Sequence, residues 1–247
     1  MRRSLLQRLQ PLRRLPIHPQ WLLSWSRSSL KRWLEQVDAQ ATVLDVGCAD
    51  QWPRQILPAS CLYLGLDYPS TSIRYLTSAD IYANARAIPL ASASVSVVLM
   101  LDVLEHFKEP VAALAEACRV LRPSGTLLIQ VPFLYPLHDL PNDYSRWTAN
   151  GLSQLLEQQG FEMLKLESDN APATTGLLLF NLALGGAMLS WVQRKSLACV
   201  MLPAMALWIL VNNLLGAALG LLLPTNDFMP HSYRILAVKR LQPATPK

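Results

Sequence analysis

Charge is scarce in this chain of 247 residues. Charged residues make up 16% of the sequence, where an ordinary soluble domain has about 25%, and hydrophobic residues make up 51%. Mean hydropathy is accordingly positive, at +0.22. This composition excludes an intrinsically disordered chain, a collagen and a coiled coil, and the length suffices for one large domain or two small ones with a real core.

Acidic residues are absent from the first 32 residues, which contain eight lysines and arginines. The net charge of the whole chain is +5, so the remainder carries −3. A basic excess confined to one terminus predicts contact with an anionic surface, either lipid or nucleic acid. Polar residues between Gln7 and Arg14 interrupt every apolar run in that stretch, so a signal peptide is not expected.

Cysteine is rare and scattered. The four cysteines form no CxxC pair, and no histidine lies near enough in the sequence to complete a zinc set. This pattern predicts a reducing, cytoplasmic setting and no metal site.

Residues 1–37 form a basic segment rich in leucine and tryptophan. Leu5, Leu9 and Leu12 are spaced by four and three residues, which predicts a helix with an apolar stripe and a basic face. For residues 1–15 two interpretations stay open: a helix lying in a membrane interface, or a cap packed on the core. For the residues that follow, the cap is favoured.

Residues 38–169 have the pattern of an α/β domain, in which short apolar runs alternate with helical stretches. The runs are too short to span a membrane and are expected to be buried strands at Thr42–Val46, Cys61–Leu66, Val95–Leu101, Thr126–Val131 and Phe161–Leu166. Helices are expected at Pro110–Leu121 and after Thr148, a plausible N-cap.

The composition changes at residue 170. Between residues 170 and 226 the only charged side chains are Arg194 and Lys195, which predicts an apolar, membrane-associated helical insertion. Residues 227–247 contain an alternating run at Ser232–Arg240, which predicts the closing strand of the same sheet and a tail.

Because strands on both sides of the insertion join one sheet, the chain must enter and leave any membrane on the same side. Arg194 and Lys195 would then lie on the far side of a two-span hairpin, against the positive-inside tendency. Pro203 and the pair Asn212-Asn213 are expected to interrupt the second apolar stretch. Shallow or re-entrant helices are therefore favoured over two spans, and a packed soluble subdomain is the third possibility.

The run Val43–Asp50 is a strand that ends in a turn containing Asp45 and Gly47. Asp67 follows twenty residues after that glycine, at the end of the next strand. Glycine lets a backbone approach a ligand, and an acid at this distance can bind both hydroxyls of a ribose. The spacing indicates a nucleoside cofactor site, although a tight turn and an acid after a buried strand also occur without one.

Several segments in order resemble the motifs of class I S-adenosylmethionine-dependent methyltransferases, of the type 11-like family. They are Val43–Asp50, Asn84–Leu90, Val97–His106, Ala115–Gly125 and Val131–Phe133. The resemblance implies an α/β, Rossmann-like sheet of seven strands in the order 3-2-1-4-5-7-6, the last one antiparallel, with the apolar insertion before the last strand. It also implies S-adenosylmethionine at the carboxyl ends of the strands.

The resemblance implies cofactor contacts for Asp45, Gly47, Cys48, Asp67, Asn84, Ala85 and Asp102. In that family Asp45 and Gly47 would face the methionine part, Asp67 the ribose, Asn84 and Ala85 the adenine, and Asp102 the sulfonium end. The sequence departs from the family where Ala49 and Gln51 replace two glycines and where Asn84 replaces an acid. Ala49 costs little if its φ is negative and more if it is positive.

The segment Pro132–Thr148 follows the fifth strand and concentrates polar side chains where ligands lie in such sheets. His138 is the candidate catalytic base, with Asp143 orienting it, and Tyr144 and Arg146 are candidates for binding the acceptor. The alternative is that Asp143 and Arg146 form an ion pair that braces the loop and that His138 is a capping group. His106 is expected to have a structural or cofactor-side role.

The predicted function is a methyltransferase that uses S-adenosylmethionine at the cytoplasmic face of a membrane. It would methylate a hydroxyl or similar group of a small-molecule, lipid- or glycan-linked acceptor, with membrane lipid as a partner. The alternative is a catalytically degenerate methyltransferase fold that acts as a membrane scaffold. Nucleic acid is not expected as a partner, because no base-flipping motif is present.

Overall fold

The computed structural model describes residues 10–24, 26–69, 78–169, 171–224 and 226–241. The chain divides into two compact units. The sheet unit comprises Leu30–Phe133, Leu137–Glu167 and Ser232–Lys247. The helical unit comprises Met1–Ser29, Leu134–Pro136 and Ser168–His231.

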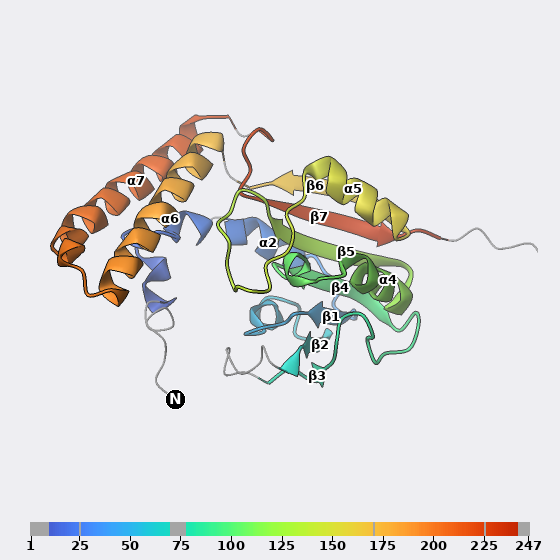
Figure 1. Ribbon diagram of the computed structural model, residues 1–247. Helices are drawn as coiled ribbons and strands as arrows, with labels where there is room; N and C mark the ends of the chain where they lie inside the picture. Colours follow the sequence, from blue (N-terminus) through green and yellow to red (C-terminus); the bar gives the residue numbers. More distant parts are fainter. Residues whose placement is uncertain (1–9, 25, 70–77, 170, 225, 242–247) are drawn as a thin grey trace, which may run out of the picture. The chain divides into compact units, whose positions relative to one another are not determined.

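A seven-stranded sheet is the centre of the sheet unit (Figure 1). Its strands are β1 (Thr42–Val46), β2 (Leu62–Asp67), β3 (Ile81–Tyr82), β4 (Val95–Leu101), β5 (Leu121–Pro132), β6 (Phe161–Ser168) and β7 (Ser232–Lys239). They lie in the order β3-β2-β1-β4-β5-β7-β6, and β7 is antiparallel to β5. The predicted fold class and strand order are confirmed. The two-residue β3 was not predicted, because so short a strand has no periodicity to detect.

The helices of the sheet unit begin and end at residues that suit helix termini. They are α4 (Pro110–Val120), α5 (Ala149–Gln158) and, from Leu30 onward, α2 (Ser26–Glu35), with short 3-10 helices η3 (Trp52–Gln55) and η4 (Leu104–His106). Pro110 occupies the first turn of α4, where no backbone donor is needed. The Oγ1 of Thr148 accepts a hydrogen bond from the Gly151 N–H at 3.2 Å, which confirms the predicted N-cap of α5.

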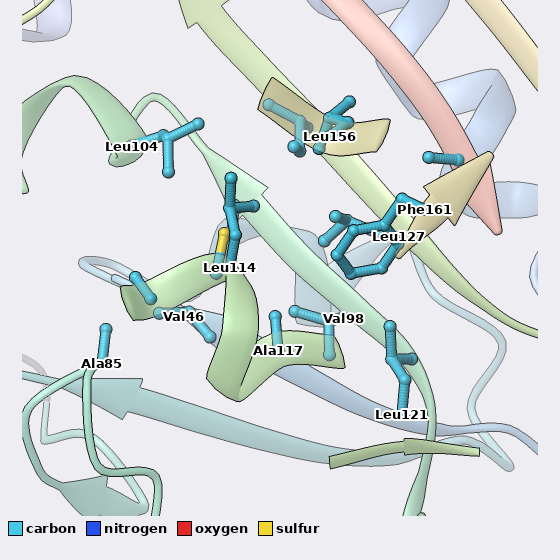
Figure 2. Close-up of a cluster of buried hydrophobic side chains, with 14 of the residues drawn as sticks. Val46, Ala85, Val98, Leu104, Leu114, Ala117, Leu121, Leu127, Leu156 and Phe161 are labelled. Carbon is cyan, nitrogen blue, oxygen red and sulfur yellow. The ribbon is translucent and has the colours of Figure 1, made fainter. Parts of the chain in front are cut away.

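Buried side chains cover both faces of the sheet, as a mostly parallel sheet requires. Side chains alternate along β1, so Leu44 belongs to one hydrophobic cluster and Val43 to another. The first cluster includes residues of α4 and α5 (Figure 2). The second includes Leu30 and Leu34, which are fully buried. The predicted cap is thus confirmed for these two leucines, whose burial contributes about 1.5–3 kcal/mol each.

Two long helices form most of the helical unit, α6 (Pro172–Gln193) and α7 (Leu202–Leu222). The short helices η1 (Gln10–Arg14), η2 (Trp21–Ser24) and η5 (Leu197–Met201) complete the unit. The expected interruption of the second apolar stretch is wrong, because α7 is continuous through Asn212 and Asn213. Pro203 lies in the first turn of α7, where it removes no intrahelical hydrogen bond.

The two asparagines lie inside a helix because other groups satisfy their amides. Asn212 Nδ2 donates to Asn181 Oδ1 at 3.1 Å, and Asn181 Nδ2 donates to Asn213 Oδ1 at 2.9 Å. Asn213 Nδ2 donates to the carbonyls of Pro16 and His18, at 2.6 and 2.9 Å. These bonds join α6, α7 and the segment before η2, and polar bridges of this kind hold helices together in apolar surroundings.

Candidate functional site

Most of the predicted cofactor residues lie at the carboxyl ends of the parallel strands. In the parallel register, Asp45 is paired with Gly65 and Asp67 with Tyr82. Gly47 and Asp102 directly follow the ends of β1 and β4. Because the carboxyl ends of parallel strands meet at the same edge, the structure brings these residues together where ligands bind in such sheets.

The turn after β1 keeps a glycine-like backbone. Gly47 has φ +75°, and a Cβ built on it would lie 2.3 Å from Val103 Cγ2. Ala49 and Gln51, which replace two glycines of the family motif, have φ of +46° and +55°. A left-handed conformation costs an ordinary residue about 1–2 kcal/mol. Ala49 thus has the positive φ that makes the loss of the motif glycine the more costly of the two cases considered.

The Asp67 carboxylate is held by the backbone around this turn. Its Oδ2 accepts a hydrogen bond from the Ala49 N–H at 3.1 Å, and its Oδ1 accepts one from the Tyr68 N–H at 2.7 Å. The residue is only 7% exposed. A carboxylate fixed in this way at a strand end is suited to accept hydrogen bonds from the hydroxyls of a ribose.

The Asp45 side chain is buried, with 2% exposed, and has a hydrogen-bond partner in the neighbouring strand β2. The Tyr63 hydroxyl donates a hydrogen bond to Asp45 Oδ2 at 2.6 Å. Burial raises the pKa of Asp45 to about 7, although the hydrogen bond from Tyr63 acts in the opposite direction. The Asp45 carboxyl therefore changes between its protonated and ionised forms near neutral pH.

The raised pKa of Asp45 predicts a pH-dependent stability. Its ordinary value is 3.8, so the folded state binds the proton more tightly than the unfolded state. The resulting stability is fully present below about pH 4, is lost as the pH rises toward 7, and stays lost above 8. At about 1.4 kcal/mol per pKa unit, wild type should lose about 2–3 kcal/mol relative to Asp45→Asn between pH 5 and 8.5 in urea denaturation.

The control for this experiment is Glu162→Gln, which removes an exposed carboxylate of β6. It should show the wild-type pH profile. A constant difference between wild type and Asp45→Asn across the pH range would contradict the raised pKa.

The remaining predicted cofactor residues differ in what they can offer. Asn84 Oδ1 accepts a hydrogen bond from the Arg86 N–H at 3.0 Å, and the side chain of Ala85 is part of the hydrophobic core. Asp102 is exposed, has φ +53°, and its Oδ2 accepts a hydrogen bond from Gln130 Nε2 at 2.7 Å. Burial and the nearby Asp45 carboxyl raise the pKa of the Cys48 thiol to about 12, so this thiol is not a nucleophile.

The acceptor loop, Pro132–Thr148, contains an ion pair between Asp143 and Arg146. Arg146 Nη2 donates to Asp143 Oδ2 at 2.8 Å, and the His138 backbone N–H donates to the same oxygen at 3.0 Å. The Arg146 guanidinium lowers the pKa of Asp143 to about 2. His138 Nδ1 lies 3.3 Å from Asp143 Oδ2. Asp143 therefore braces the loop through Arg146, and its Oδ2 also lies near the His138 ring, as the predicted orienting role would need.

The predicted acceptor-binding residues differ in exposure. Tyr144 is largely exposed, and its hydroxyl donates a hydrogen bond to Asn142 Oδ1 at 3.0 Å. Its backbone N–H donates to the Glu105 carbonyl at 2.9 Å, which fastens the loop to η4. Arg146 is half-buried and engaged with Asp143. Tyr144 is thus the more accessible of the two.

Glu105 is a residue of this region for which no role was predicted from the sequence. Its side chain is fully buried, and His138 Nε2 and His106 Nε2 lie 3.6 and 3.7 Å from its Oε1. Among the described residues, neither of its carboxylate oxygens has a hydrogen-bond partner. No sequence signal could show this grouping, because η4 and the acceptor loop meet only in the folded chain.

Comparisons of the sequence with known proteins identify the same region. Residues 44–129 match the family model of a methyltransferase domain. A probable S-adenosylmethionine-dependent methyltransferase of Mycolicibacterium smegmatis is 32% identical over 133 residues, which are 49% of this chain and 52% of that protein. One of Mycobacterium tuberculosis is 31% identical over 133 residues, 48% of each chain. The matched part thus spans about half the length of these curated relatives.

Solved structures share the fold at low sequence identity. The [4+2]-cyclase SpnF has a TM-score of 0.57 with 19% identity, and the match covers 88% of this chain and 81% of that one. An S-adenosylmethionine-dependent methyltransferase from Archaeoglobus fulgidus has a TM-score of 0.53 with 18% identity, covering 87% and 94%. One of these is a cyclase, so the fold alone does not decide the reaction. Residues 44–129 are thus similar to the methyltransferase domains of S-adenosylmethionine-dependent enzymes, and the sheet has the fold of the class I methyltransferases.

Proposed function

We propose that this protein transfers a methyl group from S-adenosylmethionine to a hydroxyl or similar group of a small-molecule, lipid- or glycan-linked acceptor at the cytoplasmic face of a membrane. The observation that carries the proposal is the Asp67 carboxylate at the end of β2, which is held by the turn after β1 within the family's fold. The acceptor loop between β5 and α5 would determine which acceptor is bound.

The carboxylates and the amide at the strand ends are of the kinds that S-adenosylmethionine needs as hydrogen-bonding partners. Asp67 is the acceptor for ribose hydroxyls, and the amide of Asn84 can donate to an adenine edge because its Oδ1 is already engaged by Arg86. The exposed carboxylate of Asp102, directly after β4, would attract the positively charged sulfonium end of the cofactor. When bound, S-adenosylmethionine supplies an activated methyl group, so the protein has mainly to align the acceptor.

The acceptor loop supplies the polar groups that a hydroxyl needs, because methylation of a hydroxyl requires the loss of its proton. His138 and Asp143 form the pair that we place at this hydroxyl, since Asp143 Oδ2 lies 3.3 Å from His138 Nδ1 and orients the ring. Exposed Tyr144 and partly exposed Arg146 would contact polar or anionic parts of the acceptor.

Calorimetric titration of the purified full-length chain with S-adenosylmethionine tests the cofactor. We expect saturable heat in the micromolar range, and transfer of a labelled methyl group to a membrane or glycolipid extract. A silent titration up to millimolar concentration would remove the cofactor and with it the enzyme.

A second candidate function is a methyltransferase-fold scaffold without catalysis. The observation that favours it is the left-handed backbone at Ala49 and Gln51, where the family motif has glycines. Cofactor binding without methyl transfer to any extract would favour the scaffold. Turnover with any acceptor excludes it.

The helical unit supports the membrane part of the proposal. Both α6 and the stretch Leu197–Leu222 are long and apolar enough to cross a membrane, and only 17% of the residues in each apolar window are buried. Exposed apolar side chains on these helices include Phe180, Leu207, Trp208, Val211, Leu214, Leu221 and Leu222. A soluble monomer seldom exposes so large an apolar patch, and inserting it contributes about 25 cal/mol per Å².

The acceptor loop is continuous in the chain with this helical unit. Its residues Leu134–Pro136 belong to the unit, and Gln20 Nε2 donates a hydrogen bond to the Tyr135 hydroxyl at 2.8 Å. This connection favours an acceptor that is itself anchored at the membrane. The basic N-terminal segment would add attraction to anionic lipid.

We expect the protein to sediment with membranes, to resist a high-salt wash and to be released by detergent. Salt screens the basic residues but does not weaken apolar insertion. Leu207→Glu combined with Leu214→Glu should move the protein into the soluble fraction, because both side chains are more than half exposed on α7. The matched control, Leu62→Glu with Val111→Glu in the sheet unit, should leave it with the membrane. A monodisperse wild-type monomer without detergent would overturn membrane association.

A further inference from the structure

Two histidines and a buried glutamate converge where η4 meets the acceptor loop. We propose that Glu105, His106 and His138 form a binding site for one divalent transition-metal ion of the Zn²⁺ type. The spacing of these residues along the sequence indicates no metal site, because His138 lies in a separate loop. The tertiary structure brings the three together within the sheet unit.

The distances suit ligands of a single ion. His106 Nε2 and His138 Nε2 lie 3.7 and 3.6 Å from Glu105 Oε1, and the three ligand atoms lie within 4.8 Å of one another. Nitrogen and oxygen ligands bind Zn²⁺ at about 2.0–2.2 Å, which places neighbouring ligand atoms about 3–4 Å apart. The two imidazole rings lie edge to face, with an interplanar angle of 73° and ring centroids 4.9 Å apart.

The other nitrogen of each ring already has the partner that metal-binding histidines require. His106 Nδ1 lies 2.7 Å from the Asn142 carbonyl oxygen, and His138 Nδ1 lies 3.3 Å from Asp143 Oδ2. A carbonyl or carboxylate at Nδ1 fixes the proton there and directs Nε2 as the ligand atom. In both histidines Nε2 is the nitrogen that faces Glu105.

The Glu105 carboxylate supplies a second, independent observation. Its side chain is fully buried, and neither oxygen has a hydrogen-bond partner among the described residues. A buried carboxylate without a partner is costly unless a cation compensates it. The positive charge of the nearby Arg146 acts on Glu105, but its guanidinium donates hydrogen bonds to Asp143 and to the Ser145 carbonyl and none to the Glu105 carboxylate. A metal ion bound by Glu105 and the two Nε2 atoms would supply the hydrogen-bond-free carboxylate with a direct partner.

The ligand types select the class of metal. Two imidazoles and one carboxylate suit Zn²⁺ and related transition metals, whereas Mg²⁺ and Ca²⁺ prefer oxygen ligands. Three protein ligands also leave a position open, as in catalytic rather than structural zinc sites. The site is therefore built to accept one more oxygen ligand.

The role of the ion in catalysis rests on the proposed function. An acceptor hydroxyl in the open position would become more acidic and would be held in place. Its proton would leave to solvent while the new O–C bond forms and the S–C bond of S-adenosylmethionine breaks. With the ion bound, His138 would act as a metal ligand in place of the proton-accepting role given above, and Asp143 would be a positioning residue that orients it.

The test is titration of chelator-stripped, full-length protein with Zn²⁺ in the absence of S-adenosylmethionine. Calorimetry should show one ion per chain, and Co²⁺ should give visible absorption bands. His106→Gln and Glu105→Gln should each weaken binding at least 10- to 100-fold, the range typical of losing even a supporting residue of a metal site. His18→Gln is the matched control, because it changes another of the four histidines far from the site in sequence, and it should bind as wild type does.

Absence of Zn²⁺ and Co²⁺ binding in wild type at micromolar concentration would overturn the site, as would unchanged binding in the double variant His106→Gln with His138→Gln. The partly exposed His106 keeps the test decisive if Glu105→Gln fails to fold. Metal binding without S-adenosylmethionine binding would refute the proposed function and leave this site standing. The reverse result would refute this site alone.

Discussion

Replacing Asp67 with alanine is expected to weaken S-adenosylmethionine binding about 10- to 100-fold, or about 1.4–2.7 kcal/mol. The carboxylate is the charged acceptor at the end of β2, and it also fixes the backbone N–H groups of Ala49 and Tyr68. Its loss removes an acceptor for ribose hydroxyls and loosens the turn that frames the site. Calorimetric titration of the variant with S-adenosylmethionine measures the effect.

Two further variants separate these contributions. Asp67→Asn keeps one acceptor oxygen but loses the charge, so its affinity should fall between wild type and Asp67→Ala. Glu109→Gln removes an exposed carboxylate that pairs with Arg86, and it should bind the cofactor as wild type does. Equal affinity of wild type and Asp67→Ala, with both folded by circular dichroism, would show that Asp67 does not hold the ribose.

Replacing Gly47 with alanine is expected to lower the free energy of unfolding by about 2–4 kcal/mol and to abolish measurable cofactor binding. Part of this is the left-handed φ of +75°, which costs a residue with a Cβ about 1–2 kcal/mol. The rest is steric, because the new Cβ would lie 2.3 Å from Val103 Cγ2 and forces either the turn or the loop after β4 to move. Urea denaturation measures the stability.

The double variant Gly47→Ala with Val103→Ala should recover the steric part of the loss but not the backbone part. Ala49→Gly is the opposite control. It relieves a left-handed alanine at φ +46° and should leave stability unchanged or raise it by up to about 1 kcal/mol. Wild-type stability of Gly47→Ala would mean that the turn does not have this conformation.

Most helices and strands of the sheet unit, though not the two-residue β3, could be predicted from the sequence because their signals are local. Strand β1 follows from a short apolar run, four of whose five residues are buried, and the N-cap at Thr148 follows from one hydroxyl before a helix. The order of the strands came from the family resemblance, and the structure confirms it. That Gly47, Asp67 and Asp102 lie near one another could also be predicted, because the carboxyl ends of parallel strands lie on the same side of a sheet.

Local signals misled where a distant partner decides the outcome. Asn212 and Asn213 looked like an interruption of the second apolar stretch, since unpaired amides disfavour a helix in apolar surroundings. Asn181 and the carbonyls of Pro16 and His18 satisfy them in the folded chain, so α7 continues. Those partners lie on α6 and before η2, and nothing in the local pattern identifies them.

The sequence by itself determined the α/β pattern of the sheet unit, the ends of most of its strands and the apolar character of α6 and α7, because each depends on periodicity or composition within one segment. Only the tertiary structure decided the conformation of the turn at Ala49, since φ depends on the packing around it. It alone also placed Glu105 between His106 and His138, and it left that carboxylate buried without a hydrogen-bond partner among the described residues. Such a grouping depends on how two loops fold onto each other, and residue spacing carries no record of it.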